Sequence, residues 1–319
     1  MIDPASEANP GSDEGTSEPL WKMVVPWIGA AAIIGYLFWK VPFFEVWAAV
    51  SVAQINWFLG ILCVAVVYWF LLDSLAYAYL ITRFNGPLSW KEARSMRGVT
   101  YLLAALNWNV GTAAIILYLR RLKQIPPLES ASTVLFYTMF DALILVFFAF
   151  LGAFFFAENA VVVKVQQGAA LILAANLIGL FILMSKFPNW AWLQKVRAWS
   201  VLRTYQQARM KDFMVLAAIR VSYLTGFVGC FVLGAYSFGI EIPIGLGLAS
   251  IPVIMVAGAL PISPAGLGTQ AAAMLFFWSG YGEEPAIVAF GLVLPVALTL
   301  IRVLLGLPYL SQFRRIQSS

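Results

Sequence analysis

Four ionisable side chains interrupt otherwise apolar stretches of this sequence: Asp73, Asp141, Arg220 and Arg302. Each lies about seven to ten residues from one end of its stretch, which in a helix places all four roughly 10–15 Å deep. Lone charges inside a bilayer are costly, so we expect these groups to face one another within a helical bundle. Two interpretations are open. The charges form ion pairs that lock the bundle, or Arg220 and Arg302 bind an anionic group such as a lipid phosphate while Asp73 and Asp141 balance charge or carry protons.

Two other apolar stretches are broken in the middle by residues unsuited to a continuous helix. Residues 98–119 are interrupted at 107–111, and residues 246–282 at 261–268. A broken helix in a bilayer frees backbone N–H groups, and these attract anions together with the aligned peptide dipoles. Alternatively, the small residues allow close helix packing, although the prolines on both sides of Ser263 favour the first interpretation. The candidate anion-binding residues at the two breaks are Asn107, Asn109, Gly111, Ser263, Gly266, Gly268, Thr269 and Gln270.

The two ends of each broken stretch carry the same kind of charge. Residues 98–119 lie between bases, namely Arg97, Arg120, Arg121 and Lys123, whereas residues 246–282 lie between acids, namely Glu241, Glu283 and Glu284. Positive charge marks the cytoplasmic side of membrane proteins. We therefore predict two re-entrant helical hairpins, the first dipping in from the cytoplasm and the second from outside. Arg120 is a further candidate substrate contact, at the cytoplasmic mouth.

Composition places these residues in a membrane bundle. The 319 residues are 62% hydrophobic and 11% charged, whereas soluble domains are about 25% charged. We predict an all-α, polytopic membrane protein with one integral domain over residues 21–319. Six stretches qualify as spanning helices, which need about 20 apolar residues. They cover roughly residues 22–40, 58–82, 131–156, 168–186, 213–238 and 285–308.

The order of these stretches predicts an inverted-topology repeat. Residues 21–156 and 168–310 each run span, span, hairpin, span, with directions reversed between the halves. Proteins built this way place a substrate site near the midplane, where broken helices meet. All clusters of bases share the cytoplasmic side if both termini are inside. Residues 1–20 are acidic and contain no base, so we expect a disordered cytoplasmic tail.

Two segments outside the spans are predicted to lie at the membrane surface. Residues 41–57 alternate bulky apolar and polar residues, with Trp47 and Trp57 suited to the headgroup level. Residues 187–212 place tryptophans and aliphatic residues at helical spacing against several bases. For that segment we expect one amphipathic helix on the inner leaflet, in contact with anionic lipid.

The sequence lacks the residues that most enzyme chemistry requires. Histidine is absent, and Cys63 and Cys230 lie within apolar runs, where they are expected to be buried thiols rather than metal ligands or a disulfide. No metalloprotease, CxxC, Walker or nucleophile-elbow motif is present. We expect no enzyme activity, no cofactor and no metal. The net charge of +5 is ascribed to cytoplasmic loops that contact anionic lipid, not to nucleic-acid binding.

The broken stretches also resemble a known family. LPISPAGLGTQAAAMLFFWSGYG (260–282) resembles the P-x-S-P-G-G-L-G-x-R-E-x-A hairpin of the lysylphosphatidylglycerol synthase transmembrane-region family, and residues 97–121 resemble its first hairpin. Asp141 and Arg302 fall where that family has an acid and an arginine. The resemblance covers most of the chain from about residue 20. Two positions depart from it: Ala265 precedes Gly266 in place of Gly-Gly, and Gln270–Ala271 replace an Arg-Glu pair.

The resemblance implies the handling of a lipid by a membrane domain, without the aminoacyl-transferase domain that the family's synthases carry. It points to a flippase-like translocase that moves a phospholipid or polyprenyl-linked lipid between the leaflets of a bacterial inner membrane. The expected partners are membrane lipids with anionic headgroups, a lipid-synthesising enzyme and a second copy of the chain. Two alternatives are a non-transporting scaffold or accessory subunit of a lipid- or glycolipid-synthesising enzyme, and a secondary transporter of a small anion.

Overall fold

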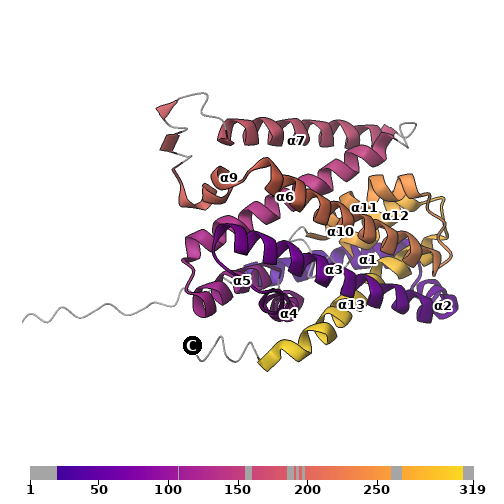
Figure 1. Cartoon of the computed structure of the whole chain (residues 1–319). Helices are drawn as coiled ribbons and strands as arrows, with labels where there is room; N and C mark the ends of the chain where they lie inside the picture. Colours follow the sequence, from indigo (N-terminus) through magenta and orange to yellow (C-terminus); the bar gives the residue numbers. More distant parts are fainter. Residues whose placement is uncertain are drawn as a thin grey trace, which may run out of the picture.

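The computed structural model describes residues 20–106, 108–154, 160–184, 190–191, 194–195, 198–259 and 268–311. Within these ranges all regular structure is helical (Figure 1). The six long helices are α1 (Leu20–Lys40), α3 (Ile55–Phe84), α6 (Pro127–Ala153), α7 (Ala160–Met184), α10 (Met210–Tyr236) and α13 (Glu284–Gly306). Each one matches a stretch predicted from the sequence, so the all-α class is confirmed.

Several of these helices are long and apolar enough to cross a membrane. In the part of the chain that the structure describes, α3, α6, α10 and α13 meet both criteria. Helix α1 meets them only together with α2 (Phe43–Val52), from which it is bent by 84°. Helix α7 contains a shorter apolar helix, Gln166–Ile182. The chain is therefore an integral membrane protein with four to five candidate spans.

Residues 90–123 form two helices that lie side by side and antiparallel, α4 (Trp90–Leu106) and α5 (Trp108–Lys123), here called the first helical pair. A capping box starts α4: the Ser89 backbone N–H donates to Glu92 Oε2 at 2.8 Å, and the Glu92 N–H donates to Ser89 Oγ at 3.3 Å. Glu92 also pairs with Lys123 at 2.6 Å, which joins the start of α4 to the end of α5. Near the other end, Gly111 packs against Ala104.

Helices α11 (Ile244–Ala259) and α12 (Thr269–Trp278) form a second antiparallel pair, the second helical pair. The start of α11 and the end of α12 are also joined. Just outside the two helices, the Glu241 N–H donates to the Tyr281 carbonyl at 2.8 Å. Trp278 Nε1 donates to Ser250 Oγ at 2.9 Å between the two helices. Both broken stretches of the sequence therefore fold as adjacent helices whose outer ends come together.

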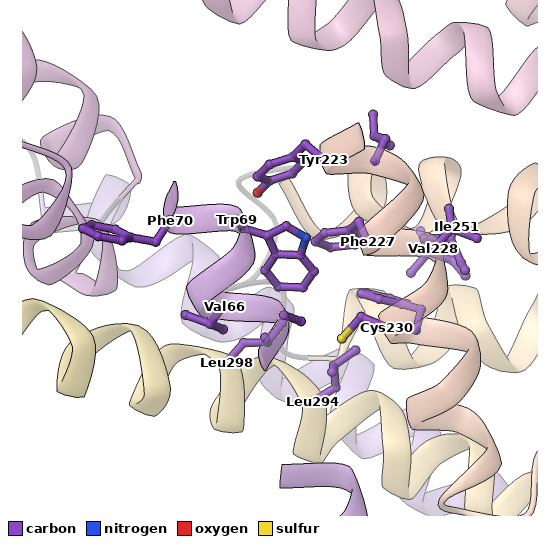
Figure 2. Close-up of a cluster of buried hydrophobic side chains, with 14 of the residues drawn as sticks. Val66, Trp69, Phe70, Tyr223, Phe227, Val228, Cys230, Ile251, Leu294 and Leu298 are labelled. Atoms are coloured by element: carbon purple, nitrogen blue, oxygen red, sulfur yellow. The ribbon is translucent and has the colours of Figure 1, made fainter. Parts of the chain in front are cut away.

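The hydrophobic core lies where α3, α10 and α13 meet. Figure 2 shows Trp69 of α3 directed at Phe227 of α10, with Leu294 and Leu298 of α13 on a neighbouring side. Trp69 is fully buried, and its ring lies 4.8 Å from that of Phe227. The ring of Tyr223 packs against the rings of Trp69 and Phe227. Tyr223 also contacts one of the charged residues described below.

Small residues bring other helices into backbone contact. A methyl group at Gly291 of α13 would lie 2.5 Å from Ala271 Cα of α12, and one at Gly152 of α6 would strike the backbone of Ala249 of α11. In membranes such close approach supplies the packing that the hydrophobic effect provides in water. The second helical pair is therefore fixed on two sides by small residues.

The expectation of one amphipathic helix over residues 187–212 is wrong for the described part of that segment. A 3-10 turn, η2 (Ser200–Leu202), leads into the short helix α9 (Arg203–Gln207), and extended backbone at Ala208 separates α9 from α10. The segment is held to α6 instead of lying free: the Thr204 N–H donates to Ser132 Oγ at 2.9 Å, and Arg203 pairs with Glu129. Polar contacts with α6 thus override the amphipathic pattern. Residues 41–57 contain α2, as predicted, while residues 1–19 of the expected tail lie outside the described residues.

Candidate functional site

The buried carboxylate of Asp73, on α3, is the centre of a polar cluster within the bundle. Its side chain is 5% exposed. Arg97 Nη2 of α4 lies 2.5 Å from Oδ2, and Arg220 Nη1 of α10 lies 2.9 Å from Oδ1. Tyr137 of α6 and Tyr101 of α4 donate hydroxyl hydrogen bonds at 2.6 and 3.3 Å. Three helices, α4, α6 and α10, thus supply partners for one carboxylate on α3.

Arg220 connects Asp73 to a second acid. Its Nη1 bonds Asp73 and also Tyr137 Oη at 2.7 Å, while its Nη2 pairs with Asp141 Oδ1 of α6. Arg220 is 3% exposed, whereas the Asp141 side chain is 36% exposed. Two acids and two bases therefore balance within this group, and Asp141 is its accessible member.

Tyrosine rings enclose the arginines of this cluster. The Arg220 guanidinium lies 3.9 Å from the Tyr223 ring centre, and the Arg97 guanidinium lies 4.9 Å from that of Tyr101. Such contacts are worth more when desolvated, up to about 2 kcal/mol. The Arg97 guanidinium also lies 5.3 Å from the ring centre of Tyr77, and the Arg220 guanidinium lies 5.1 Å from that of Tyr137.

Arg302, on α13, adjoins this cluster but is not neutralised by it. Its guanidinium lies 5.8 Å from the ring centre of Tyr101, and its Nε is buried without a hydrogen-bond partner. Nε of Arg97 and Arg220 also lack partners, but their Nη atoms bind Asp73. Among the residues that the structure describes, no carboxylate pairs with Arg302. With Arg302 included, three bases face two acids, and one positive charge is unbalanced.

The profile of a family described as the lysylphosphatidylglycerol synthase TM region matches residues 23–306. The chain belongs to this family. No curated protein and no solved structure gives a significant match. The resemblance read from the two broken stretches is therefore confirmed over nearly the whole length of the chain.

In this family member the expected mutual pairing is confirmed for Asp73, Asp141 and Arg220. It is wrong for Arg302, since Arg97 occupies that place in the cluster. The sequence suggested that Arg97 was a flanking base marking the end of an apolar stretch. Helix α4 instead begins at Trp90, so Arg97 lies two turns inside it and is only 7% exposed. A base near the end of an apolar stretch can thus be an internal ion-pair partner.

The cluster carries a sequence signal that charge alone did not reveal. Each of its four paired charges has a tyrosine three or four residues away on the same helix, the spacing that places two side chains on one face. These pairs are Asp73 with Tyr77, Arg97 with Tyr101, Asp141 with Tyr137, and Arg220 with Tyr223.

Residues predicted at the breaks take part in helix packing wherever the structure describes their surroundings. Gly111 contacts Ala104. Gly268 has a φ of +86°, which favours glycine, and packs against α1, while the side chain of Gln270 lies over Gly258 of α11. Thr269 is buried at the start of α12, and Arg120 is exposed in the last turn of α5. Asn107, Ser263, Gly266 and the side chain of Asn109 lie outside the described residues.

Among the described residues, no group of three or more His, Cys, Asp or Glu side chains is placed to hold a metal ion. The chemistry that the cluster does offer is charge recognition, through one arginine that lacks an acidic partner and one acid that is open on one side.

Proposed function

We propose that this protein moves an anionic lipid, a phospholipid or a polyprenyl-linked lipid, between membrane leaflets, and that Arg302 binds its phosphate. The observation that carries the proposal is the unbalanced positive charge of Arg302 beside a group that is otherwise neutral. Membership of a family named for the membrane region of a lipid synthase supports a lipid as the ligand.

Charge and geometry favour Arg302 over Arg220 as the phosphate contact. An uncompensated charge in a bilayer costs several kcal/mol, roughly 2.5–3.5 on insertion scales, and a phosphodiester would balance it. Guanidinium groups bind phosphate through two parallel hydrogen bonds. Both Nη atoms of Arg220 are already on carboxylates. Of the two arginines first expected to bind the anion, Arg302 is therefore the proposed contact, and Arg220 positions the acids.

Tyr101 offers a route by which an anion at Arg302 acts on the rest of the cluster. Its hydroxyl bonds Asp73, and its ring lies beside both Arg97 and Arg302. An anion that draws Arg302 away from the ring would change the field at Asp73. Asp141, which is partly exposed, is the acid proposed to exchange protons with water as this happens.

We further propose that the two helical pairs are re-entrant, entering the bilayer from opposite faces as halves of an inverted-topology repeat. Support comes from the contacts that join the outer ends of each pair, Glu92 to Lys123 and Glu241 to Tyr281. Rocking of one half against the other would expose the cluster to each leaflet in turn. The bases near the first pair support the proposal that this pair and both termini lie on the cytoplasmic side. Family membership supports a bacterial inner membrane as the location.

Leaflet exchange in liposomes tests the proposal. The purified protein is reconstituted in phosphatidylcholine vesicles that contain fluorescent phosphatidylglycerol, phosphatidylcholine or polyprenyl phosphate, and external fluorophores are quenched with dithionite. We expect faster exchange of anionic lipids than in empty vesicles. Arg302→Gln should slow exchange roughly 10- to 100-fold, since a hydrogen bond to a charged group contributes about 1.5–3 kcal/mol. Lys91→Gln, at an exposed base to which no binding role is assigned, is the control and should exchange lipid at the wild-type rate.

The outcomes separate the alternatives. Exchange no faster than in empty vesicles for every lipid contradicts translocation and favours the scaffold or accessory role. Uptake of free phosphate without lipid exchange favours a small-anion transporter. Wild-type exchange by Arg302→Gln removes Arg302 as the phosphate contact and leaves translocation standing.

A further inference from the structure

An apolar groove of about 380 Å³ lies between α6, α7 and the segment that carries α9. This volume falls within the range of roughly 300–1,000 Å³ found for small-molecule sites. Leu135, Met139 and Leu143 of α6 form one wall, Gly179 and Leu180 of α7 the other, and Tyr205 of α9 one end. Figure 1 shows α7 along one edge of the molecule, beside α6.

The shape of the groove follows the helices that line it. Leu135 and Leu143 are two turns apart on α6, which is about 12 Å at 1.5 Å per residue. Gly179 leaves open space on the α7 wall, since no atom lies within 4 Å of where a β-carbon would stand. Apart from Asn176 and the hydroxyl of Tyr205, the side chains that line the groove are apolar. A groove of this polarity along a candidate membrane span suits a hydrocarbon chain.

One end of the groove adjoins positive charge. Phe213 of α10 lines the groove, and the exposed bases Arg209 and Lys211 lie four and two residues before it. Nearby acids are already engaged: Glu129 pairs with Arg203, and Asp212 with Arg83. The excess of bases at this end is complementary to an anionic headgroup, and bases mark the cytoplasmic side.

We infer that this groove binds one acyl chain of an anionic inner-leaflet phospholipid, whose headgroup lies beside Arg209 and Lys211. The site is separate from Arg302. The ring of Phe213 packs against Phe136 and Phe140 at 5.4 and 6.0 Å, and Phe140, which lines the groove, is one residue before Asp141. The residues that line the groove do not include Arg302, so binding in the groove is proposed separately from transport.

Photo-crosslinking in nanodiscs tests the inference. The discs contain phosphatidylcholine with a small fraction of phosphatidylglycerol that carries a diazirine midway along one chain, and labelled residues are mapped by mass spectrometry. We expect Met139, Leu143 and Leu180 to be labelled several-fold more than Leu304, which is 64% exposed on α13. Equal labelling of groove and exposed residues overturns the inference, since it describes ordinary bilayer contact.

Two glycines of α7 provide a matched pair of variants. Gly179→Leu fills the groove and should lower its labelling several-fold. Gly168→Leu makes the same change eleven residues earlier, about three turns away on the same face, and it also meets open space, so its labelling should equal that of the wild type. Leucine favours helix over glycine, so neither change disrupts α7. Equal labelling of the two variants overturns the inference.

Two further arms separate this inference from the proposed function. The same diazirine on phosphatidylcholine should label the groove less, and equal labelling overturns the assignment of an anionic headgroup. Arg302→Gln should label the groove as the wild type does. Loss of labelling in that variant overturns the separation of the two sites, and absent leaflet exchange with intact labelling contradicts only the proposed transport.

Discussion

The two helical pairs have similar shapes but are held in the bundle by different forces. The first pair carries six bases and one acid: Lys91, Glu92, Arg94, Arg97, Arg120, Arg121 and Lys123. The helices of the second pair contain no ionisable residue. Arg97 ties the first pair to Asp73, whereas Ala249 and Ala271 tie the second to glycines of α6 and α13.

This difference shows how one arrangement of helices supports two tasks. Close packing through small residues fixes the second pair rigidly and leaves little room for a ligand. Ion pairing through one long side chain fixes the first pair while keeping charge near Arg302 and Tyr101. Under the proposed function, the first pair is therefore the one in which binding of an anion would change the contacts of the bundle, and the second pair is the frame.

The largest expected effect is the loss of the tie between the first pair and Asp73. Arg97→Gln leaves Asp73 with one cation where it had two, and breaking a buried pair costs about 3–5 kcal/mol. We expect a strongly lowered Tm for the purified protein in detergent, measured by fluorescence-detected size exclusion after heating. Arg94→Gln, one turn earlier on α4, removes a base that stacks on Trp90 and should change the Tm little. Equal losses in the two variants would show that Asp73 does not hold the first pair.

The second pair should respond to added volume instead of lost charge. Gly291→Ala forces a methyl group onto Ala271, and overpacking costs about 1–3 kcal/mol. Gly60→Ala, on α3, meets open space and should raise stability by up to about 1 kcal/mol, since alanine favours helix. The two substitutions therefore shift the Tm in opposite directions. A raised Tm for Gly291→Ala would mean that α12 and α13 are not in backbone contact.

The contrast between the pairs was only partly predictable from sequence. Apolar length predicted six spans, of which four to five are candidate spans in the described residues, and unusual residues predicted the two breaks. Both are local properties of the sequence. Ionisable residues inside apolar stretches pointed to Asp73, Asp141 and Arg220. Their partners were harder to predict, because pairing depends on how each helix is rotated about its axis.

Arg97 and Arg302 show the limit of reading charge alone. Arg97 resembled a topology marker because it stands at the edge of an apolar run, and Arg302 resembled a pairing partner because it stands within one. The structure reverses these roles. The tyrosines at one-turn spacing were visible in the sequence, but aromatic residues are so frequent in this chain, at 15%, that spacing alone did not distinguish them.

A smaller effect tests the hydrogen bond inside the second pair. Ser250→Ala removes the acceptor of the Trp278 N–H and leaves a buried donor unpaired, at a cost of about 1–2 kcal/mol. The same substitution in a Trp278→Phe background should cost less, because no donor remains to be stranded. Tm values of the two single variants and the double variant give this coupling. An additive double variant would show that the bond contributes nothing to the contact between α11 and α12.

The smallest effect distinguishes the pairs by pH. The hydrogen bond from Lys123 holds the pKa of Glu92 below its usual value of 4.5, with help from Ser89. Because the folded-state pKa is the lower one, the ionised carboxylate stabilises the fold above that usual value. The contribution is lost as pH falls through the folded-state pKa. Glu92 is 39% exposed, so its ion pair with Lys123 contributes less than about 1 kcal/mol to the stability of the fold.

The difference in Tm between wild type and Glu92→Gln should therefore be small near neutral pH, shrink in high salt, and vanish in acid. The difference between wild type and Ser250→Ala should stay constant over the same range, since neither helix of the second pair titrates. A Glu92→Gln difference that is equally insensitive to pH and salt would mean that the open end of the first pair is held by packing, as the second pair is. The division between a charged, responsive pair and an apolar frame would then apply only at the ion pair of Asp73 with Arg97, which lies five residues after Glu92 on α4.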